Sequence, residues 1–347
     1  MSLIAEDLIP WQVKYGRHFL PWQNRRDPYA VWLSEIMLQQ TQVKTVIPYY
    51  QRFIEKFPDV ENLAQASVDD VLALWSGLGY YARARNLHQA AREIIQNYKG
   101  IFPQDSEKIQ QLPGIGRSTA AAITVFAYGN RAAILDGNVK RVFARYFGID
   151  RYPGEPATLK KLWALAEASL PENNDSDKIR IYTQALMDLG SMICVRHKPA
   201  CSQCPLISRC VAYQAGSVAQ LPVSKPKKQI PVKETVFMIY RHNHKLLLEK
   251  RSDKGIWGGL WCFPEYNMDD IIVNSTKNSM PVKLPRLPHA FTHFKLWIQP
   301  CLREVDLETE TKADVSENPI VWVEPDKVLE LAIPAPVRKL IQQHFIT

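Results

Sequence analysis

The pattern of apolar residues changes about two thirds of the way along this 347-residue chain, and that change most constrains its fold. From Leu3 to about Ala215, apolar residues recur at spacings of three and four, which is typical of helices. The segment Ser217–Val232 loses this period and contains three prolines and three lysines, as an exposed linker does. We therefore predict an all-α domain over residues 1–216, a linker over 217–231 and a second domain over 232–347.

The second domain combines strand and helix signals. Two apolar runs, 235–240 and 245–249, flank the polar turn His242-Asn243-His244, which predicts a hairpin. Residues 291–298 form a further strand candidate, and residues 334–345 have the pattern of a terminal helix. We expect this domain to belong to the α+β class.

Charge and hydropathy narrow the range of partners. The chain has 43 basic and 35 acidic side chains, and this net charge of +8 favours a polyanionic partner without identifying one. No run reaches the roughly 18 apolar residues that a membrane span needs, and the first ten residues include Glu6 and Asp7. These features exclude the membrane and secreted classes, so we expect a cytoplasmic protein.

Four of the six cysteines lie close together in the sequence. Cys194, Cys201, Cys204 and Cys210 have the spacing C-x6-C-x2-C-x5-C. In a cytosolic chain, this clustering favours a metal centre over disulfides. Zinc and an iron–sulfur cluster both fit the spacing, although the single C-x2-C pair modestly favours iron–sulfur. The basic side chains of this loop could face phosphates or could simply be solvated.

A glycine-containing turn joins two predicted helices at residues 112–120 (LPGIGRSTA). Glycines at 114 and 116 allow tight turning, and free N–H groups at the start of the second helix can bind a phosphate. An ordinary helix–helix turn explains an isolated G-x-G equally well.

Glu35 is the first candidate catalytic carboxylate. Asp27 and Pro28 predict a helix start, and the helix is expected to continue to Val43. Neighbours three and four residues away, including Val31 and Leu38, place Glu35 on a mainly apolar face. Desolvation there should raise its pKa, as a general acid needs, although a salt bridge would also explain a glutamate in this place.

Asp136 is the second candidate. It follows an apolar run over 132–135 and precedes Gly137, Asn138 and a predicted helix. Most aspartates at such a position are helix caps that contribute about 1 kcal/mol and no chemistry. The string ILDGNVKRV at 134–142, downstream of the turn at 112–120, nevertheless resembles the segment that holds the essential aspartate in helix-hairpin-helix glycosylases, which implies a functional carboxylate.

These motifs together resemble the helix-hairpin-helix superfamily of DNA base-excision glycosylases. Within it, three strings resemble the MutY-type adenine DNA glycosylases almost letter for letter: LPWQ at 20–23, WLSEIMLQQTQV at 32–43 and GLGYYARARNL at 77–87. The resemblance implies one 4Fe-4S cluster on the four cysteines. It also implies a duplex DNA partner in which adenine is paired with 8-oxoguanine or guanine.

The resemblance further implies roles for single residues. Glu35 would protonate adenine and later activate water, Asp136 would stabilise the positively charged sugar, and Asn138 would position that carboxylate. Trp22 and Gln184 would line the adenine pocket. The residues implied in DNA contact are Gln40 and Tyr80, which would insert into the duplex, together with Gly114, Gly116 and Ser118.

Ser118 bears on the type of glycosylase. Related endonuclease III enzymes have a lysine there, whose amine attacks the sugar and allows strand cleavage. Serine cannot form that Schiff base, so the resemblance implies a monofunctional glycosylase that leaves an abasic site. Residual lyase activity would need another amine, such as Lys140.

The second domain resembles the Nudix-like C-terminal domain of the same family, through the string GIWGGLWCFPE at 255–265. Residues 266–271 (YNMDDI) lack the acidic array that binds magnesium in Nudix hydrolases, so pyrophosphate hydrolysis is not expected. The family's F-S-H loop, which contacts 8-oxoguanine, matches Phe291-Thr292-His293. A surface pair on a plain strand is the alternative for Thr292 and His293.

Three other functions fit the sequence less well than adenine removal does. A bifunctional endonuclease III-like enzyme is disfavoured by Ser118, and a nucleotide-pool hydrolase by its missing metal-binding residues. A metal-stapled DNA-binding adaptor leaves Glu35 and Asp136 without a role. We expect a monomer that acts on nucleoid DNA in the cytoplasm.

Overall fold

The computed structural model describes residues 3–23, 25–172, 175–225, 230–267, 281–305 and 318–346. Contacts between residues divide the chain into two compact units. The first comprises Met1–Gln65 and Asn86–Lys227, and the second comprises Ala66–Arg85 and Lys228–Thr347. The predicted linker includes residues 226–229, which lie outside the described part.

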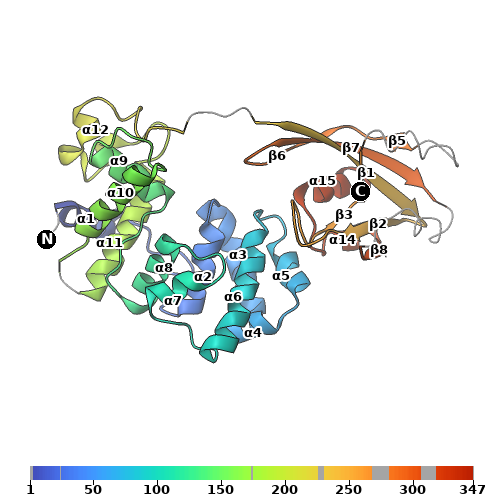
Figure 1. Cartoon of the computed structure of the whole chain (residues 1–347), viewed down its shortest axis with the longest axis horizontal. Helices are drawn as coiled ribbons and strands as arrows, with labels where there is room; N and C mark the ends of the chain where they lie inside the picture. Colours follow the sequence, from blue (N-terminus) through green and yellow to red (C-terminus); the bar gives the residue numbers. More distant parts are fainter. Residues whose placement is uncertain are drawn as a thin grey trace. The chain divides into compact units, whose positions relative to one another are not determined.

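The first unit is built from helices (Figure 1). Its α-helices are α1 (Leu3–Tyr15), α2 (Pro28–Leu38), α3 (Val43–Lys56), α4 (Val60–Gln65), α6 (Ala82–Tyr98, which starts in the second unit), α7 (Ser106–Gln111), α8 (Arg117–Ile123), α9 (Gly137–Tyr146), α10 (Pro156–Ala168), α11 (Ser176–Asp188) and α12 (Val211–Gln214). Two π-helical turns, η1 (Thr124–Tyr128) and η2 (Leu189–Ile193), extend α8 and α11, and two 3-10 turns, η3 (Cys201–Gln203) and η4 (Ile207–Arg209), lie in the cysteine loop.

Helix α2 begins as predicted but ends earlier. The Asp27 side chain accepts hydrogen bonds from the backbone N–H groups of Tyr29 and Ala30, at 3.2 and 3.1 Å, which caps the helix start. The helix ends at Leu38 instead of continuing to Val43, so that prediction is wrong. Residues 39–42 are four polar side chains that cannot continue the buried apolar face, and the chain turns there with Gln40 at φ 57°.

The helix after the glycine-containing turn ends at Gly129, whose φ of 73° is in the left-handed region that favours glycine. Helix α9 then contributes Val139, Val142 and Phe143 to the core of the first unit, as its apolar pattern predicts. The core is completed mainly by side chains of α1, α10 and α11. The segment between Gly129 and α9 therefore enters this core just before Asp136.

The second unit contains α5 (Val68–Trp75) and an eight-stranded sheet with helices α14 (Pro325–Val328) and α15 (Ala335–His344). The strands are β1 (Val232–His242), β2 (Lys245–Lys250), β3 (Trp261–Cys262), β4 (Glu265–Tyr266), β5 (Val282–Lys283), β6 (Leu287–Ala290), β7 (Lys295–Glu304) and β8 (Ile320–Val323). The sheet order is β3-β2-β1-β7-β5, with β4 on β1, β6 on β7 and β8 on β2. Strands β1 and β7 pair in parallel, and the other pairs are antiparallel. The α+β prediction is confirmed.

The predicted hairpin of the second unit is confirmed. His242 pairs with Lys245, and Asn243 and His244 both have positive φ, as a two-residue hairpin loop requires. The prediction of a strand over 291–298 is wrong in its first half. Residues 291–294 form the turn between β6 and β7, with a backbone hydrogen bond of 2.9 Å from Phe291 N–H to the Phe294 carbonyl.

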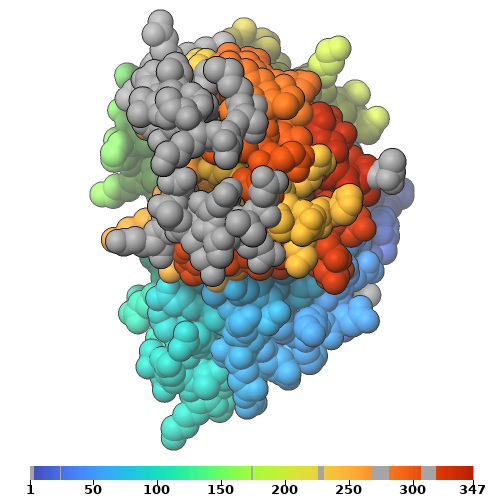
Figure 2. Space-filling model, turned by 90° about the vertical axis from the view of Figure 1, so that its right-hand side faces the viewer, coloured from blue at the N-terminus to red at the C-terminus, as the bar shows by residue number. Residues whose placement is uncertain are grey.

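The sheet packs its alternate side chains into a core. Val236, Met238 and Tyr240 of β1 join Leu247 and Cys301 on one face, which follows the two-residue period of strands. Figure 2 shows C-terminal residues of this unit, coloured amber to red, on one face of the molecule. The YNMDDI segment lies partly outside the described residues, since 268–271 are not described. Among described residues, no helix combines the length and apolar character that crossing a membrane requires.

Candidate active site

One cavity of the first unit, about 1640 Å³ in volume, brings together eight of the predicted site residues. Three segments that are far apart in the sequence form its walls: 12–43, 116–141 and 180–196. The predicted residues that line it are Trp22, Glu35, Gln40, Gly116, Ser118, Asp136, Asn138 and Gln184.

Glu35 has the electrostatic environment of a general acid. It lies on α2, between the buried side chains of Val31, Ser34 and Ile36, and lines the cavity. Burial penalises its charged form and, with the nearby charge of Asp136, raises the pKa of Glu35 to about 8. At neutral pH this carboxyl therefore holds a proton that it can donate to a molecule in the cavity.

Asp136 serves both as a helix cap and as a cavity wall. Its side chain accepts a hydrogen bond of 2.8 Å from the N–H of Val139, which caps α9. Burial raises the pKa of Asp136, while hydrogen bonds from the amides of Val139 and Asn138 and the charge of Arg141 oppose this shift. Burial has the larger effect, so the pKa of Asp136 lies above its ordinary value, and the amides limit that rise.

Asn138 is held by Arg141, a residue that the sequence analysis missed. The guanidinium donates to Asn138 Oδ1 at 2.9 Å, to the carbonyl of Gly190 at 2.6 Å and to the carbonyl of Cys194 at 2.8 Å. These bonds connect α9 to the chain that enters the cysteine loop, which fixes the start of the helix that carries Asp136.

Ser118 has a structural contact that its sequence does not reveal. Its Oγ accepts a hydrogen bond of 2.9 Å from the N–H of Leu135, the residue before Asp136. Gly114 has a φ of 77°, and a Cβ there would lie 2.9 Å from the Cβ of Asn86. Gly116 differs, because an added Cβ would meet nothing within 4 Å. The chain itself therefore does not require glycine at 116, whereas close approach of another molecule would.

The cavity wall is strongly basic. Beside the two carboxylates of Glu35 and Asp136, six arginines line it: Arg17, Arg25, Arg26, Arg141, Arg180 and Arg196. Such a wall attracts a polyanion and places cations where phosphates can lie.

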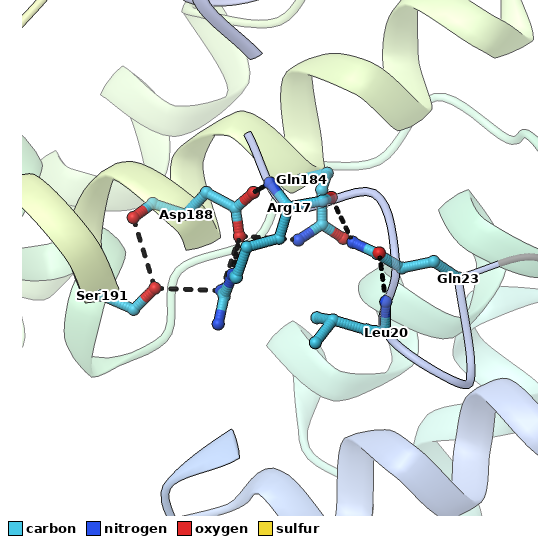
Figure 3. A network of polar contacts seen from close by, with 6 residues as sticks. All are labelled: Arg17, Leu20, Gln23, Gln184, Asp188 and Ser191. Atoms are coloured by element: carbon cyan, nitrogen blue, oxygen red, sulfur yellow. Dashed lines mark hydrogen bonds and ion pairs between the residues drawn. The ribbon is translucent and has the colours of Figure 1, made fainter. Parts of the chain in front are cut away.

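A buried polar network borders the same cavity (Figure 3). Asp188 is completely buried and accepts hydrogen bonds from Arg17 and Gln184. Ser191 receives a further bond of 2.9 Å from Arg17. The sequence analysis predicted Gln184 but missed Arg17 and Asp188. Asp188 gives a weaker signal than Glu35, because only two of its neighbours at three and four residues, Ala185 and Met192, are apolar.

The four cysteines lie in one loop of the first unit, each partly exposed and unpaired by disulfides. The guanidinium of Arg145 lies 3.4 Å from the sulfur of Cys194. Burial raises the pKa of the Cys204 thiol to about 12, and the other three thiols of the loop add to that shift. Among described residues, no three His, Cys, Asp or Glu side chains are arranged to hold a single metal ion.

Other predicted residues lie outside the cavity walls. Tyr80 is 46% exposed and has a φ of 50°, which bulky residues rarely adopt. Its ring lies 5.4 Å from the guanidinium of Arg83. Thr292 and His293 are exposed at the tip of the β6–β7 turn, which removes the alternative of a plain strand pair.

Comparison with known families supports the class that this site indicates. Residues 33–168 match the model of the HhH-GPD superfamily of base excision DNA repair proteins, and residues 235–343 match the NUDIX domain. A thermostable thymine-DNA glycosylase structure is similar over 61% of this chain and 96% of its own, with 32% identity and a TM-score of 0.56. An endonuclease III–DNA complex, 22% identical with a TM-score of 0.51, shares the fold. The chain is thus a helix-hairpin-helix DNA N-glycosylase.

Full-length relatives define the family more closely. The adenine DNA glycosylase of Buchnera aphidicola subsp. Baizongia pistaciae is 39% identical over 342 residues, which cover 97% of this chain and 95% of that protein. A shorter match, to the adenine DNA glycosylase of Homo sapiens, is 42% identical over 226 residues, which cover 62% of this chain and 40% of that protein. The chain belongs to the adenine DNA glycosylase family.

Proposed function

We propose that this chain removes adenine mispaired with 8-oxoguanine or guanine from duplex DNA and leaves an abasic site. The observation that carries the proposal is the pairing of Glu35 and Asp136 in one basic cavity. Burial raises the pKa of both carboxyls, but at Asp136 two backbone amides and the charges of Arg141 and Lys140 oppose the shift, whereas at Glu35 the nearby charge of Asp136 adds to it. Pairs of carboxyls with such different environments divide the roles of acid and charge stabiliser.

Glu35 begins the reaction on an adenine flipped into the cavity. Its proton moves to N7 of the base, and the bonding electrons of the glycosidic bond leave with the adenine. The resulting positive charge on the deoxyribose is stabilised by the carboxylate of Asp136, which the amide of Val139 holds in place. Glu35, now ionised, accepts a proton from the water that adds to the sugar carbon.

Ser118 supports a monofunctional reaction, since no amine extends from that position. Its hydroxyl is instead occupied with the N–H of Leu135. Lys140, the other amine considered, is not among the described residues that line the cavity. Strand cleavage through a Schiff base is therefore not part of the proposal.

Backbone strain supports the roles of Gln40 and Tyr80 in DNA contact. Both have a positive φ, at 57° and 50°, and both side chains are exposed. Strained conformations of non-glycine residues concentrate at functional sites, and inserted side chains must project from the surface to enter a base stack. Gly114 and Gly116 form the turn along which the DNA backbone would pass, with room for close approach at Gly116.

Thr292 and His293 are proposed to contact 8-oxoguanine opposite the adenine. Their exposure at a hairpin tip makes both accessible, and the threonine hydroxyl can donate as well as accept a hydrogen bond. The aromatic ring of Phe291 stacks on Phe294, with centroids 4.5 Å apart, and so stiffens the turn that carries them.

A 4Fe-4S cluster is proposed on Cys194, Cys201, Cys204 and Cys210. Four thiolates suit iron, and all four thiols are close enough to influence one another electrostatically. The cluster would fasten the loop to α9 through Arg145 and would take no part in bond cleavage. A monomer that acts in the cytoplasm completes the proposal.

The decisive experiment incubates excess protein with a labelled duplex that contains adenine opposite 8-oxoguanine, with and without hot alkali. Breaks that appear only after alkali establish adenine excision without lyase action, and the Glu35→Gln variant should give none. Breaks without alkali would favour the bifunctional rival. Tight binding without breaks in either lane would favour a DNA-binding adaptor. A duplex with adenine opposite guanine, run in parallel, measures the preference between the two mispairs.

A further inference from the structure

We propose that Asp188, together with Arg17, is a positioning residue that selects purines with a 6-amino group by fixing the side-chain amide of Gln184. The inference rests on the proposed function, because it concerns the base that occupies the same cavity. It adds a specificity determinant that does not itself contact the base.

The geometry around Asp188 determines which end of the amide faces it. Asp188 Oδ1 accepts from Arg17 Nε at 2.7 Å and from Gln184 Nε2 at 2.9 Å. Asp188 Oδ2 accepts from the backbone N–H of Arg17 at 2.8 Å. A carboxylate only accepts hydrogen bonds, so the amide of Gln184 must turn its NH2 group toward Asp188.

The opposite end of the amide then faces the base. Gln184 lines the cavity, and with its nitrogen bound to Asp188 it offers its oxygen as an acceptor. Adenine carries a 6-amino group, which donates. Hypoxanthine and guanine carry a 6-oxo group, which would meet that oxygen acceptor to acceptor. A site that leaves a polar group unpaired against the wrong base discriminates strongly.

Arg17 connects the same carboxylate to the cavity wall formed by residues 12–43. Its carbonyl accepts a bond of 2.8 Å from Gln23 Nε2, and Gln23 Oε1 accepts one of 3.0 Å from the N–H of Leu20. Trp22 lies within this closed loop and lines the cavity, with its ring 5.3 Å from that of Tyr50. Figure 3 shows Arg17, Gln184 and Ser191 gathered around Asp188.

Stability alone is a weak reason for this arrangement. A buried ion pair gains little over apolar side chains of similar size, because both charges lose their hydration. The side chain of Asp188 has no exposed surface, and that of Arg17 is 18% exposed. The orientation of Gln184 gives the pair a function that an apolar pair could not provide.

The test compares single-turnover excision of three bases opposite the same partner: adenine, hypoxanthine and unsubstituted purine. Purine has no 6-substituent and cannot sense the amide of Gln184. Asp188→Asn can present either an oxygen or an NH2 group, so it no longer imposes one orientation. We expect the rate ratio of adenine to hypoxanthine to fall roughly tenfold, or about 1.4 kcal/mol. The ratio of adenine to purine should fall in the same direction.

Two further variants keep the test decisive. Asp69→Asn breaks a 2.7 Å ion pair with Lys250 in the second unit and should leave both ratios unchanged. Gln184→Ala should lose the adenine preference even if Asp188→Asn fails to fold, since Gln184 is only partly buried. Equal loss for all three bases in Asp188→Asn, or an unchanged ratio in Gln184→Ala, would overturn the inference. Absence of adenine excision by the unaltered chain would instead overturn the proposed function.

Discussion

Replacing Glu35 with glutamine should stabilise the protein at neutral pH while it abolishes excision. The pKa of Glu35 rises from 4.5 to about 8 on folding, mainly because burial penalises its charge. Each pKa unit corresponds to about 1.36 kcal/mol of differential stability. The rise from 4.5 to about 8 therefore corresponds to about 5 kcal/mol of unfolding free energy. This figure is an upper limit, because water in the cavity reduces the penalty on the charge.

The sign follows from proton binding. Between pH 4.5 and 8 the folded chain keeps a proton on Glu35 that the unfolded chain has lost. The free energy of unfolding therefore falls as the pH rises through this window, and the loss is complete above about pH 8. At pH 7, about 2.5 pH units above the ordinary pKa of 4.5, the free energy of unfolding has fallen by about 3 kcal/mol. Glutamine has the same shape, cannot ionise and avoids this loss.

Urea denaturation of the full chain at pH 5, 6, 7 and 8 measures the effect. The unfolding free energy of Glu35→Gln relative to the parent should be below about 1 kcal/mol at pH 5 and should rise to about 3 kcal/mol at pH 7. Glu55→Gln, which changes an exposed glutamate on α3, is the matched control and should show no such slope. Parallel pH curves for Glu35→Gln and the parent would refute the assignment of a protonated, buried Glu35.

Three other predictions concern Asp136, Ser118 and the cysteine loop. Asp136→Asn should keep the cap on α9 and change the unfolding free energy by less than about 1 kcal/mol, because asparagine caps as well as aspartate. Its single-turnover excision should nevertheless be lost, and near-normal turnover would reduce Asp136 to a cap. Ser118→Ala should lower the unfolding free energy by about 1–3 kcal/mol, because the N–H of Leu135 loses its acceptor; Ser118→Thr, which keeps a hydroxyl, is its control. Analysis of the purified protein should find iron and sulfide, together with absorption near roughly 400 nm. Cys204→Ser should diminish that absorption. Stoichiometric zinc without the absorption would contradict the cluster.

Local chemistry explains which structural elements could be predicted from the sequence. The Asp27 cap, the start of α2, the core face of α9 and the hairpin at Asn243-His244 depend on residues within a few positions of one another. The two wrong predictions, the end of α2 and the start of the strand at 291–298, concern segments whose composition fits two different structures. Residues 39–42 have a composition that a helix accepts, but they have no apolar side chain to bury. Residues 291–294 contain aromatic side chains, which are common in strands, but they form a turn.

The catalytic carboxylates were predictable for a similar reason. Glu35 stands out because its helical neighbours are apolar, and Asp136 because it directly precedes a helix after a buried run. Their meeting in one cavity was not predictable from spacing, since 100 positions separate them. It required the resemblance to a family, and the cavity that both line now supports it independently.

Asp188 shows where sequence reasoning stops. Its helical neighbours are less apolar than those of Glu35 and indicate its burial only weakly, and its partner Arg17 lies 171 positions away in the chain. Arg17 and Gln184 share Oδ1 of Asp188 as their acceptor, so the orientation of the amide depends on a carboxylate that a cation far away in the sequence holds in place. The choice between a 6-amino and a 6-oxo purine therefore depends on a long-range ion pair, which only the folded structure reveals.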